Sequence, residues 1–437
     1  MKTSRYNIFF EKDGSYFLYN TLTSSIIEID KQSSKVLQSG IGLEGLPKKD
    51  LNIFMEEGVI VKDDCDEYTL YKNFYTGLQK NKDQEALVIT IIPTYSCNIR
   101  CSYCYQGSIE NYNEKVRFFN PQIERIIHFI HKSLENYPTI KEIVIDLFGG
   151  EPLLYQKQLE SILTQVRNLC KTRGLKYRTS ISTNGLLINQ FTIDQIFIPN
   201  NMRIQLTIDG IKSTHDTKRV DKQGNGTYDK IVSKIMLLYK HNLKNNIIIR
   251  VNIDKNNISE IRQVIDKFTS YVKNIYLAPM NSQGNNSCHK QDCLEEEQFV
   301  CEVFEEFSDH LDANQKGSDV ALFGKKSPCS FNSNRLSYFI DYRMNVYTCD
   351  GLVGISDFCI GSINEHGELI LNQNYYSQKE MGPFENEQCR SCILLPLCAG
   401  GCFFKRYIHH GDINKPFCEK SQETLIKFLT KYISKKS

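Results

Sequence analysis

The stretch "ALVITIIPTYSCNIRCSYCYQ", residues 86–106, decides how the rest of this sequence is interpreted. It begins with an apolar run, 86–94, that has the length and composition of a buried strand. It then places Cys97, Cys101 and Cys104 at a C-x3-C-x2-C spacing. Three thiolates can hold a [4Fe–4S] cluster and leave one iron open, whereas a structural zinc site uses four ligands. We therefore expect a cluster whose open iron binds a substrate or cofactor.

Strand and helix patterns alternate after this stretch. Strands are expected at 86–94, 141–149, 177–185, 202–210, 245–254 and 274–279, and helices between them include 121–137 and 158–174. Six such units predict an α/β fold with a parallel sheet, either doubly wound or an incomplete barrel. In both, ligands bind at the carboxyl ends of the strands. Those ends carry the cysteines and the segments "FGGEP", "STNG", "IDG" and "NIDKNN".

The segments on either side of this core, 86–280, have different patterns. In residues 1–77, three short strand patterns precede a helix stopped by Gly40 and a second helix that runs into a strand. This order predicts a small winged-helix domain. A polar linker is expected at 78–86. Residues 281–328 form an expected bridge that contains a helix, 294–311, and residues 329–437 combine short strands, cysteine-rich loops and a final helix, 421–433.

Composition excludes several classes of protein. The 437 residues carry a net charge of +2, which gives no electrostatic reason to expect nucleic-acid binding. No apolar run approaches the roughly 20 residues of a membrane span, and the N-terminus has no apolar signal-peptide core. We therefore expect a cytoplasmic protein. In a reducing compartment, 16 cysteines at short spacings indicate metal binding or catalysis.

The first cysteine motif, with an aromatic residue before its last cysteine, resembles the signature of radical S-adenosylmethionine (SAM) enzymes. The resemblance implies a partial (β/α)6 TIM-like barrel, with Tyr103 in the SAM site. It implies that Cys97, Cys101 and Cys104 hold a [4Fe–4S] cluster whose open iron binds SAM. One electron, from a donor such as ferredoxin or flavodoxin, then cleaves SAM to methionine and a 5′-deoxyadenosyl radical, which abstracts hydrogen from a C–H bond.

Four further segments resemble SAM-binding motifs of that family. "GGEP" (149–152) is similar to the motif whose backbone and acidic side chain bind the SAM amino group, and "STNG" (182–185) to the one that contacts its ribose and carboxylate. "DGIKSTHDTKR" (209–219) makes Arg219 the candidate partner of the SAM carboxylate. "RVNID" (250–254) lies near the cofactor, although a structural role is an equal alternative there. The implied cofactor-binding residues are Gly149, Gly150, Glu151, Ser182, Asn184, Arg219 and Asn252.

The late cysteines resemble the SPASM domain, a C-terminal extension that carries two auxiliary [4Fe–4S] clusters. The resemblance implies an outer cluster held by Cys389, Cys392, Cys398 and Cys418, and an inner cluster held by Cys329, Cys349 and Cys402. Met344 departs from the pattern because it stands where a turn Gly is expected. A zinc-ribbon-like module is the alternative that the spacing alone permits.

The fourth ligand of the inner cluster is left open. Phe323 occupies the position of the usual cysteine. Either Cys288, Cys293 or Cys301 is the fourth ligand of the inner cluster, or one iron has no protein ligand and could bind a substrate thiolate.

SPASM enzymes mostly act on peptides or proteins. One branch cross-links ribosomally made precursor peptides through thioether or C–C bonds, a second converts Cys or Ser of sulfatases to formylglycine, and a third epimerises residues. Residues 1–77 resemble the leader-recognition element of the peptide maturases, in which an extended leader pairs with an exposed strand edge. This favours the cross-linking branch and a precursor peptide as partner. The motifs also permit a small-molecule dehydrogenase or a non-catalytic peptide-binding scaffold.

One residue favours the second branch. Asp350 follows Cys349, as does the proposed base of the sulfatase-maturing enzymes. It is our catalytic candidate, with a turn residue before Gly351 as the alternative.

Overall fold

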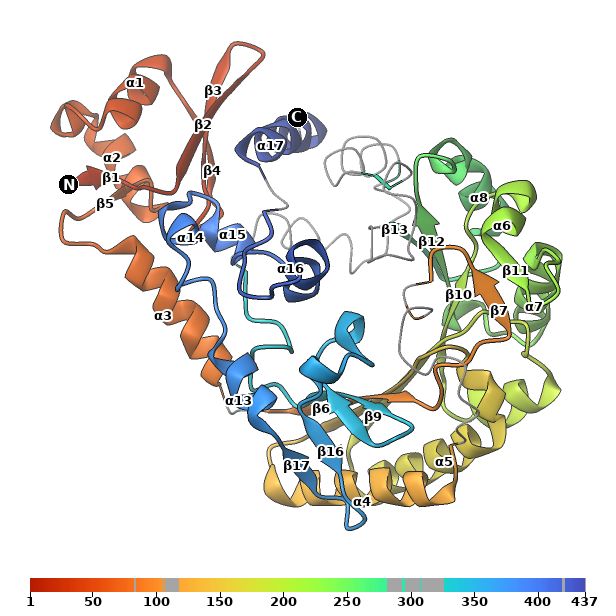
Figure 1. The fold of residues 1–437 in the computed structure, drawn as a ribbon. Coiled ribbons are helices and arrows are strands. Elements are labelled where there is room, and N and C mark those ends of the chain that lie inside the picture. The colour runs from red at the N-terminus through yellow and green to blue at the C-terminus, as the bar shows by residue number, and fades with distance from the viewer. Residues whose placement is uncertain are drawn as a thin grey trace.

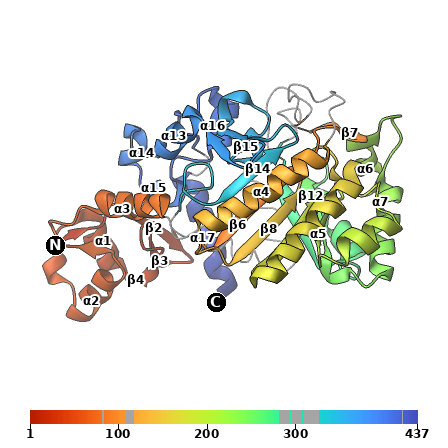
Figure 2. The same cartoon turned by 90° about the horizontal axis from the view of Figure 1, so that it is seen from below.

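The structure is a computed structural model that describes residues 1–81, 84–104, 106, 118–280, 293–294, 307, 326–418 and 421–436. Most of the expected helix at 294–311 and most of the expected bridge lie outside the described residues, as do Cys288, Cys301 and Phe323. The N-terminal and C-terminal segments lie side by side, and the central sheet curves away from them (Figures 1 and 2).

Six parallel strands form the centre of the molecule, as the sequence predicts. In spatial order they are β13 (Asn274–Pro279), β12 (Ile247–Ile253), β10 (Arg203–Thr207), β9 (Lys176–Ser182), β8 (Glu142–Leu147) and β6 (Ala86–Ile92). Every neighbouring pair is parallel. Strand β12 is buried along most of its length, as expected for a strand covered on both faces.

Helices cover the outer face of these strands (Figure 1). They are α4 (Asn120–Asn136), α5 (Gln156–Arg173), α6 (Lys212–Lys218), α7 (Tyr228–Lys240) and α8 (Ile261–Phe268). Helix α4 buries Ile123, Ile126 and Ile130 at the spacing of one helix face. The inner face is thereby left to the loops at the strand ends.

The C-terminal part continues the central sheet, which the sequence pattern did not predict. Strand β14 (Ser337–Asp341) pairs parallel with β6, and β15 (Asn345–Tyr347), β16 (Gly361–Ile363) and β17 (Leu369–Leu371) follow antiparallel. The turn between β14 and β15 holds Met344 at φ 66°, in the left-handed region that glycine favours. The turn expected there therefore exists without its glycine.

The N-terminal part contains the strands and helices that the sequence predicts. Strands β2 (Asn7–Lys12), β3 (Ser15–Asn20) and β4 (Ile26–Ile29) form an antiparallel sheet, and β1 (Lys2–Thr3) pairs with β5 (Ile60–Val61). Helix α1 (Lys31–Ser39) begins at the Asp30 cap and ends at Gly40 in the left-handed conformation, and α2 (Lys48–Glu56) follows. The winged-helix assignment itself stays a prediction.

Helix α3 (Glu67–Lys80) follows the N-terminal strands and helices in the chain and packs against the C-terminal part. The sequence pattern did not predict it. It occupies the first residues of the expected linker at 78–86. Its Tyr71 and Tyr75 pack against Phe384 and Cys389 of the C-terminal part. Gln79 donates to the carbonyl oxygens of Lys379 and Met381 at 2.8 and 3.0 Å.

The C-terminal part is built from short helices. They are α13 (Gln373–Glu380), α14 (Glu387–Ser391), α15 (Leu395–Cys398), α16 (Phe403–His410) and α17 (Gln422–Lys436). The final helix, α17, covers one face of the N-terminal sheet, where Phe428 and Leu429 pack with Ile8, Phe10 and Tyr19. Helices α1 and α2 cover the other face. The two ends of the chain therefore share a core.

Leu429→Ala should lower the free energy of unfolding by about 3 kcal/mol, because a fully buried leucine would leave a cavity between α17 and the N-terminal sheet. The measurement is the shift in the denaturation midpoint. Lys427→Ala is the matched control on the same helix, since its side chain is exposed and its ion pair with Glu423 contributes little to stability. Equal midpoints for the two variants would contradict the shared core.

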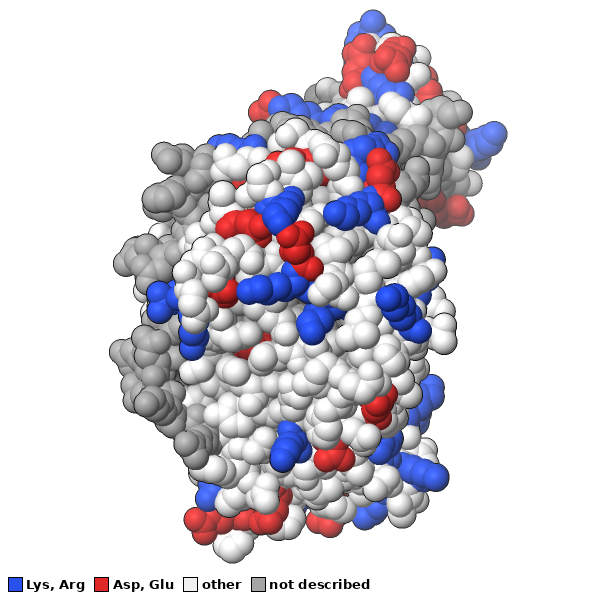
Figure 3. Space-filling view, turned by 90° about the vertical axis from the view of Figure 1, so that its right-hand side faces the viewer, with Lys and Arg blue, Asp and Glu red and all other residues white. Residues whose placement is uncertain are grey.

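Positive and negative side chains are interspersed on the face of the barrel drawn in Figure 3. Within the described part of the chain, every helix is too short or too polar to cross a lipid bilayer.

Candidate active site

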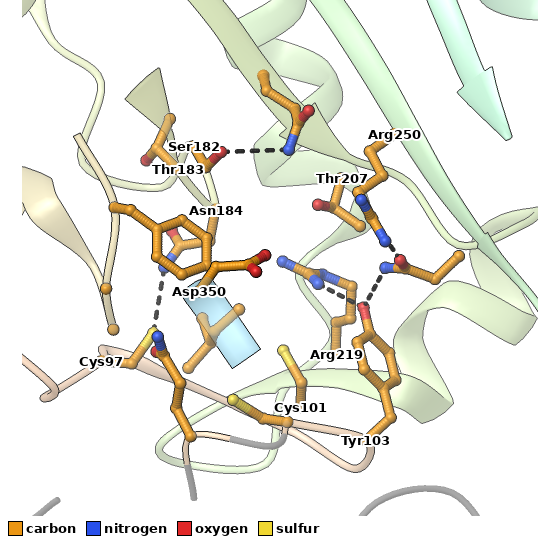
Figure 4. A pocket seen from close by; sticks show the side chains of 18 of the residues that line it. Cys97, Cys101, Tyr103, Ser182, Thr183, Asn184, Thr207, Arg219, Arg250 and Asp350 are labelled. Atoms are coloured by element: carbon orange, nitrogen blue, oxygen red, sulfur yellow. Dashed lines mark hydrogen bonds between the residues drawn. The ribbon is translucent and has the colours of Figure 1, made fainter. Parts of the chain in front are cut away.

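A cavity of about 340 Å³ lies at the carboxyl ends of the parallel strands. Its walls come from the cysteine loop after β6, the loops after β8 and β9, strands β10 and β12, and the segment at 350–351. Figure 4 shows side chains from these elements pointing toward one space. Predicted site residues that line it are Cys97, Cys101, Tyr103, Cys104, Gly149, Gly150, Ser182, Asn184, Arg219, Asn252 and Asp350.

A short antiparallel pair holds the cysteine loop beside Arg219. Strand β7 (Ile99–Cys101) pairs with β11 (Arg219–Asp221), and Cys101 lies opposite Arg219. Burial raises the pKa of Cys97 to about 11 and that of Cys101 to about 12. Both are therefore neutral thiols near neutral pH, and a bound metal would displace their protons.

Tyr103 lies at the centre of a buried polar network. Its hydroxyl donates to Asp209 and accepts from Arg219 and from the Asn252 amide, the last at 3.0 Å. Asp209 also accepts from the backbone and side-chain nitrogens of Asn252, each at 3.0 Å. Asp209 is fully buried and was not among the predicted site residues. It fixes the side chains that surround it because a buried carboxylate needs these donors.

Arg219 carries the feature that best indicates a ligand. Burial opposes its charge, but the neighbouring Cys101, Tyr103 and Asp209 raise its pKa well above the usual value. Near neutral pH the Asp209 carboxylate, 3.7 Å away, is the anion that keeps it cationic. Its Nε atom is buried and has no hydrogen-bond partner among the described residues. A buried guanidinium N–H without an acceptor is costly, and guanidinium groups bind carboxylates well. The residues present therefore fit a ligand that carries a carboxylate, as SAM does.

The two glycines of GGEP allow close packing within the chain. A Cβ on Gly149 would lie 2.5 Å from the Thr94 carbonyl oxygen, and one on Gly150 would lie 2.1 Å from that of Ser96. The Gly150 and Glu151 N–H groups donate to these same two oxygens at 3.0 Å. The loop is therefore fastened to the residues directly before Cys97.

Glu151 does not line the cavity in the described structure. Its carboxylate is fully buried and accepts from Leu153 N, Thr183 Oγ1 and Asn184 N at 2.7–2.9 Å. It thus ties the GGEP loop to the STNG loop. The expectation that it accepts from the SAM ammonium stays a prediction.

Asp350 reaches the cavity from the C-terminal part. It begins a short 3₁₀ helix, Asp350–Leu352, directly after Cys349. Gly351 and Phe404 line the cavity next to it. The sequence places Asp350 far from the parallel strands, and the pairing of β14 with β6 brings the two parts together.

A match to a known protein family indicates which kind of domain contains this cavity. Residues 91–268 match the model described as the radical SAM superfamily, within the expected core. The middle of this chain is a radical SAM domain. Its cysteine loop, the carboxyl ends of its parallel strands and the buried Arg219 all line one cavity.

Sequence relatives and a solved structure align with most of the chain, beyond the radical SAM domain. A cysteine-type anaerobic sulfatase-maturating enzyme of Clostridium novyi is 26% identical over 80% of this chain and 98% of its own length. The radical SAM cyclopropyl synthase TigE of Paramaledivibacter caminithermalis is 22% identical over 92% of this chain and 89% of its own. The structure of Streptococcus suis SuiB bound to precursor peptide SuiA covers 96% of this chain and 99% of SuiB, with 15% identity and a TM-score of 0.55.

Outside the radical SAM domain, the late cysteines lie in two neighbourhoods. Burial and the neighbouring Asp350, Cys402 and Cys329 raise the pKa of Cys349. Burial and the neighbouring Cys398, Cys418 and Cys392 raise the pKa of Cys389 to about 11. These are the two groups that the resemblance assigns to the inner and outer clusters. Among the described residues, no three His, Cys, Asp or Glu side chains gather closely enough to hold a single metal ion.

The radical SAM domain also contributes cavity residues that the sequence reasoning missed. Gln205 and Thr207 lie at alternate positions of β10, and Arg250 lies two residues before the predicted Asn252 on β12. Polar residues at alternate positions of otherwise apolar strands are a signal that could have found them, because these share a face. Gln106 also lines the cavity, and its buried Nε2 has no partner within the part of the chain that the structure describes. No sequence signal indicated this residue.

Proposed function

We propose that this chain is a radical SAM peptide maturase that oxidatively cross-links a ribosomally made precursor peptide. The observation that carries the proposal is one cavity that combines three cysteines, the buried Arg219 and a carboxylate from the cysteine-rich C-terminal part. The Arg219 Nε–H has no partner among the residues that the structure describes. The cysteines and Arg219 fit a cluster and SAM. The carboxylate gives the chain a group that can take a proton from a substrate in the same space.

Different residues of the chain would bind the cofactors and accept the proton. Cys97, Cys101 and Cys104 would ligate the cluster, and Arg219 would hold the SAM carboxylate. Tyr103 and Asn252 would border the cofactor, since Asp209 already fixes their polar ends. When bound, SAM and the cluster would supply the one-electron chemistry that removes a hydrogen atom from the peptide, and auxiliary clusters would supply an acceptor for the second electron. Asp350 takes the accompanying proton, so two hydrogens leave the peptide.

The two cysteine neighbourhoods would hold two auxiliary [4Fe–4S] clusters. Three clusters in all correspond to about 12 irons per chain. A peptide-binding scaffold without chemistry would contain far less iron, so iron and labile sulfide content separates it from an enzyme. The fourth ligand of the inner cluster could be Cys288, Cys301 or the buried Cys293. The alternative is that one iron has no protein ligand.

The N-terminal part would bind the leader of the precursor. In the described structure β4 is paired with β3 on one side, and no strand pairs with its other edge. An extended peptide can add to such an edge through backbone hydrogen bonds. An alignment that covers 96% of this chain must include most of residues 1–77, and the protein aligned there is SuiB bound to its precursor peptide.

The test is anaerobic and uses the full chain with reconstituted clusters. The protein is mixed with SAM, a strong reductant and any short cysteine-containing peptide encoded beside its gene, in deuterated buffer. We expect the peptide to lose two hydrogens and to resist alkylation of its thiol. Solvent deuterium gained without that loss would mean epimerisation and would overturn the cross-linking proposal.

Formylglycine formation is the second candidate, and Asp350 favours it. This residue lines the cavity, and one sequence relative is a sulfatase-maturating enzyme. The same experiment separates the two products, because conversion of cysteine to formylglycine replaces the thiol by an aldehyde and loses sulfur, whereas a cross-link keeps it.

Asp350→Asn should lower the rate of product formation by about 100-fold or more while 5′-deoxyadenosine is still formed, since a general base typically contributes that much to a rate. Both products are quantified in one assay. Asp357→Asn, in the nearby 3₁₀ segment Ser356–Phe358, is the control. Equal product formation by Asp350→Asn and wild type would exclude Asp350 as the proton acceptor.

A further inference from the structure

The side-chain amide of Asn184 links the STNG loop to the first cluster cysteine. It is almost fully buried, with 5% of its surface exposed. Its Nδ2 donates to Asn98 Oδ1 at 2.7 Å and to Cys97 Sγ at 3.5 Å. Figure 4 shows the second of these as a dashed line across the edge of the cavity.

The orientation of this amide is determined by its other end. Asn184 Oδ1 accepts from the Leu186 N–H at 3.0 Å. A flipped amide would set an oxygen against Asn98 Oδ1 and an NH₂ group against that N–H, which removes both hydrogen bonds. The backbone N–H of Asn184 is also bound, at 2.8 Å, to Glu151. The donor is therefore held toward Cys97.

A hydrogen bond to a cysteine sulfur changes the electronic properties of the cluster that the cysteine holds. Hydrogen bonds to the sulfurs help set the reduction potential of iron–sulfur clusters. A donor stabilises the more negative, reduced cluster more than the oxidised one, because bonds to charged acceptors are stronger. Loss of the donor should therefore make the potential more negative and the reduced cluster scarcer.

We propose that Asn184 is a positioning residue that orients Cys97 and raises the reduction potential of the SAM-binding cluster. The proposal rests on the proposed function, because it needs that cluster. It differs from the expected role of Asn184 as a SAM contact. A SAM contact would lower the affinity for SAM and leave the potential of the SAM-free cluster unchanged, whereas a sulfur donor shifts that potential in the absence of SAM.

The experiment is a redox titration of the reconstituted full chain without SAM, followed by electron paramagnetic resonance. The signal of the SAM-binding cluster is identified as the one that changes when SAM is then added. For Asn184→Ala we expect about a tenfold fall in the equilibrium constant for reduction, which is a shift of about 59 mV to more negative potential for one electron. Asn184→Asp keeps the acceptor for Leu186 N–H, lacks the donor and should shift in the same direction.

Two controls separate this effect from general damage. Asn200→Ala removes another buried amide of the same domain, one that accepts from Arg167 and donates to Ile196. It should lower stability and leave the potential unchanged. Asn98→Ala removes the other acceptor of this amide and its own contact with Cys97 Sγ but keeps the Asn184 donor, so its shift in potential should be smaller than that of Asn184→Ala.

Either failure is recognisable. If the cluster forms in Asn184→Ala or Asn184→Asp with the wild-type potential, the inference is wrong and the proposed function stands. If wild type binds no SAM-responsive cluster, both are wrong.

Discussion

Cys101→Ala should reduce 5′-deoxyadenosine formation to background while the chain stays folded. Cys101 lies in the cavity wall on β7, and its backbone pairs with Arg219 whatever its side chain. Removal of one sulfur from the cavity wall leaves that pairing intact. It leaves two thiolates where a cluster with one open iron needs three. The reaction is followed anaerobically, with iron content and thermal unfolding measured on the same sample.

The control for this variant is Cys65→Ala, in the N-terminal part far from the cavity in sequence. We expect about 8 irons per chain for Cys101→Ala and about 12 for the control, because one cubane cluster is lost. Continued formation of 5′-deoxyadenosine by Cys101→Ala would contradict the radical assignment.

Gly150→Ala should lower the free energy of unfolding by about 3 kcal/mol and the rate of SAM cleavage by about 100-fold. Its Cβ would lie 2.1 Å from the Ser96 carbonyl oxygen and 2.5 Å from that of Tyr95. Both are backbone atoms, which cannot rotate away as a side chain can. The flanking N–H groups of Gly150 and Glu151 hold the loop in place at 3.0 Å. Relief of the clash must therefore move the segment directly before Cys97.

Gly77→Ala is the matched control, because a Cβ on this glycine of α3 meets nothing within 4 Å. We expect it to stabilise the chain by about 0.5–1 kcal/mol, the usual gain for alanine over glycine within a helix. Denaturation midpoints and initial rates of 5′-deoxyadenosine formation are measured for both variants. A Gly150→Ala chain with wild-type midpoint and rate would show that the GGEP loop is not fastened to the cysteine loop.

Local patterns predicted the elements well where one periodicity runs over a whole element. The six parallel strands, α4 and α5 follow apolar runs and one-face helix spacings, which depend only on neighbouring residues. The end of α1 at Gly40 follows from glycine's tolerance of φ 69°. Helix α3 was missed because part of it falls in a polar stretch, and its buried tyrosines pack on the C-terminal part.

The chemical groups of the cavity are readable from the sequence, because the cysteine spacing, the GGEP glycines and the segment that ends at Arg219 are short motifs. The partners of these groups depend on the three-dimensional fold. In the folded chain, Glu151 is buried and links two loops, and the Asn184 side chain donates to Cys97. The pairing of β14 with β6 brings Asp350 to the cavity. These outcomes depend on which buried donors meet which acceptors across distant segments. A sequence motif identifies the polar groups that are present, but the packing of distant segments determines which donor pairs with which acceptor.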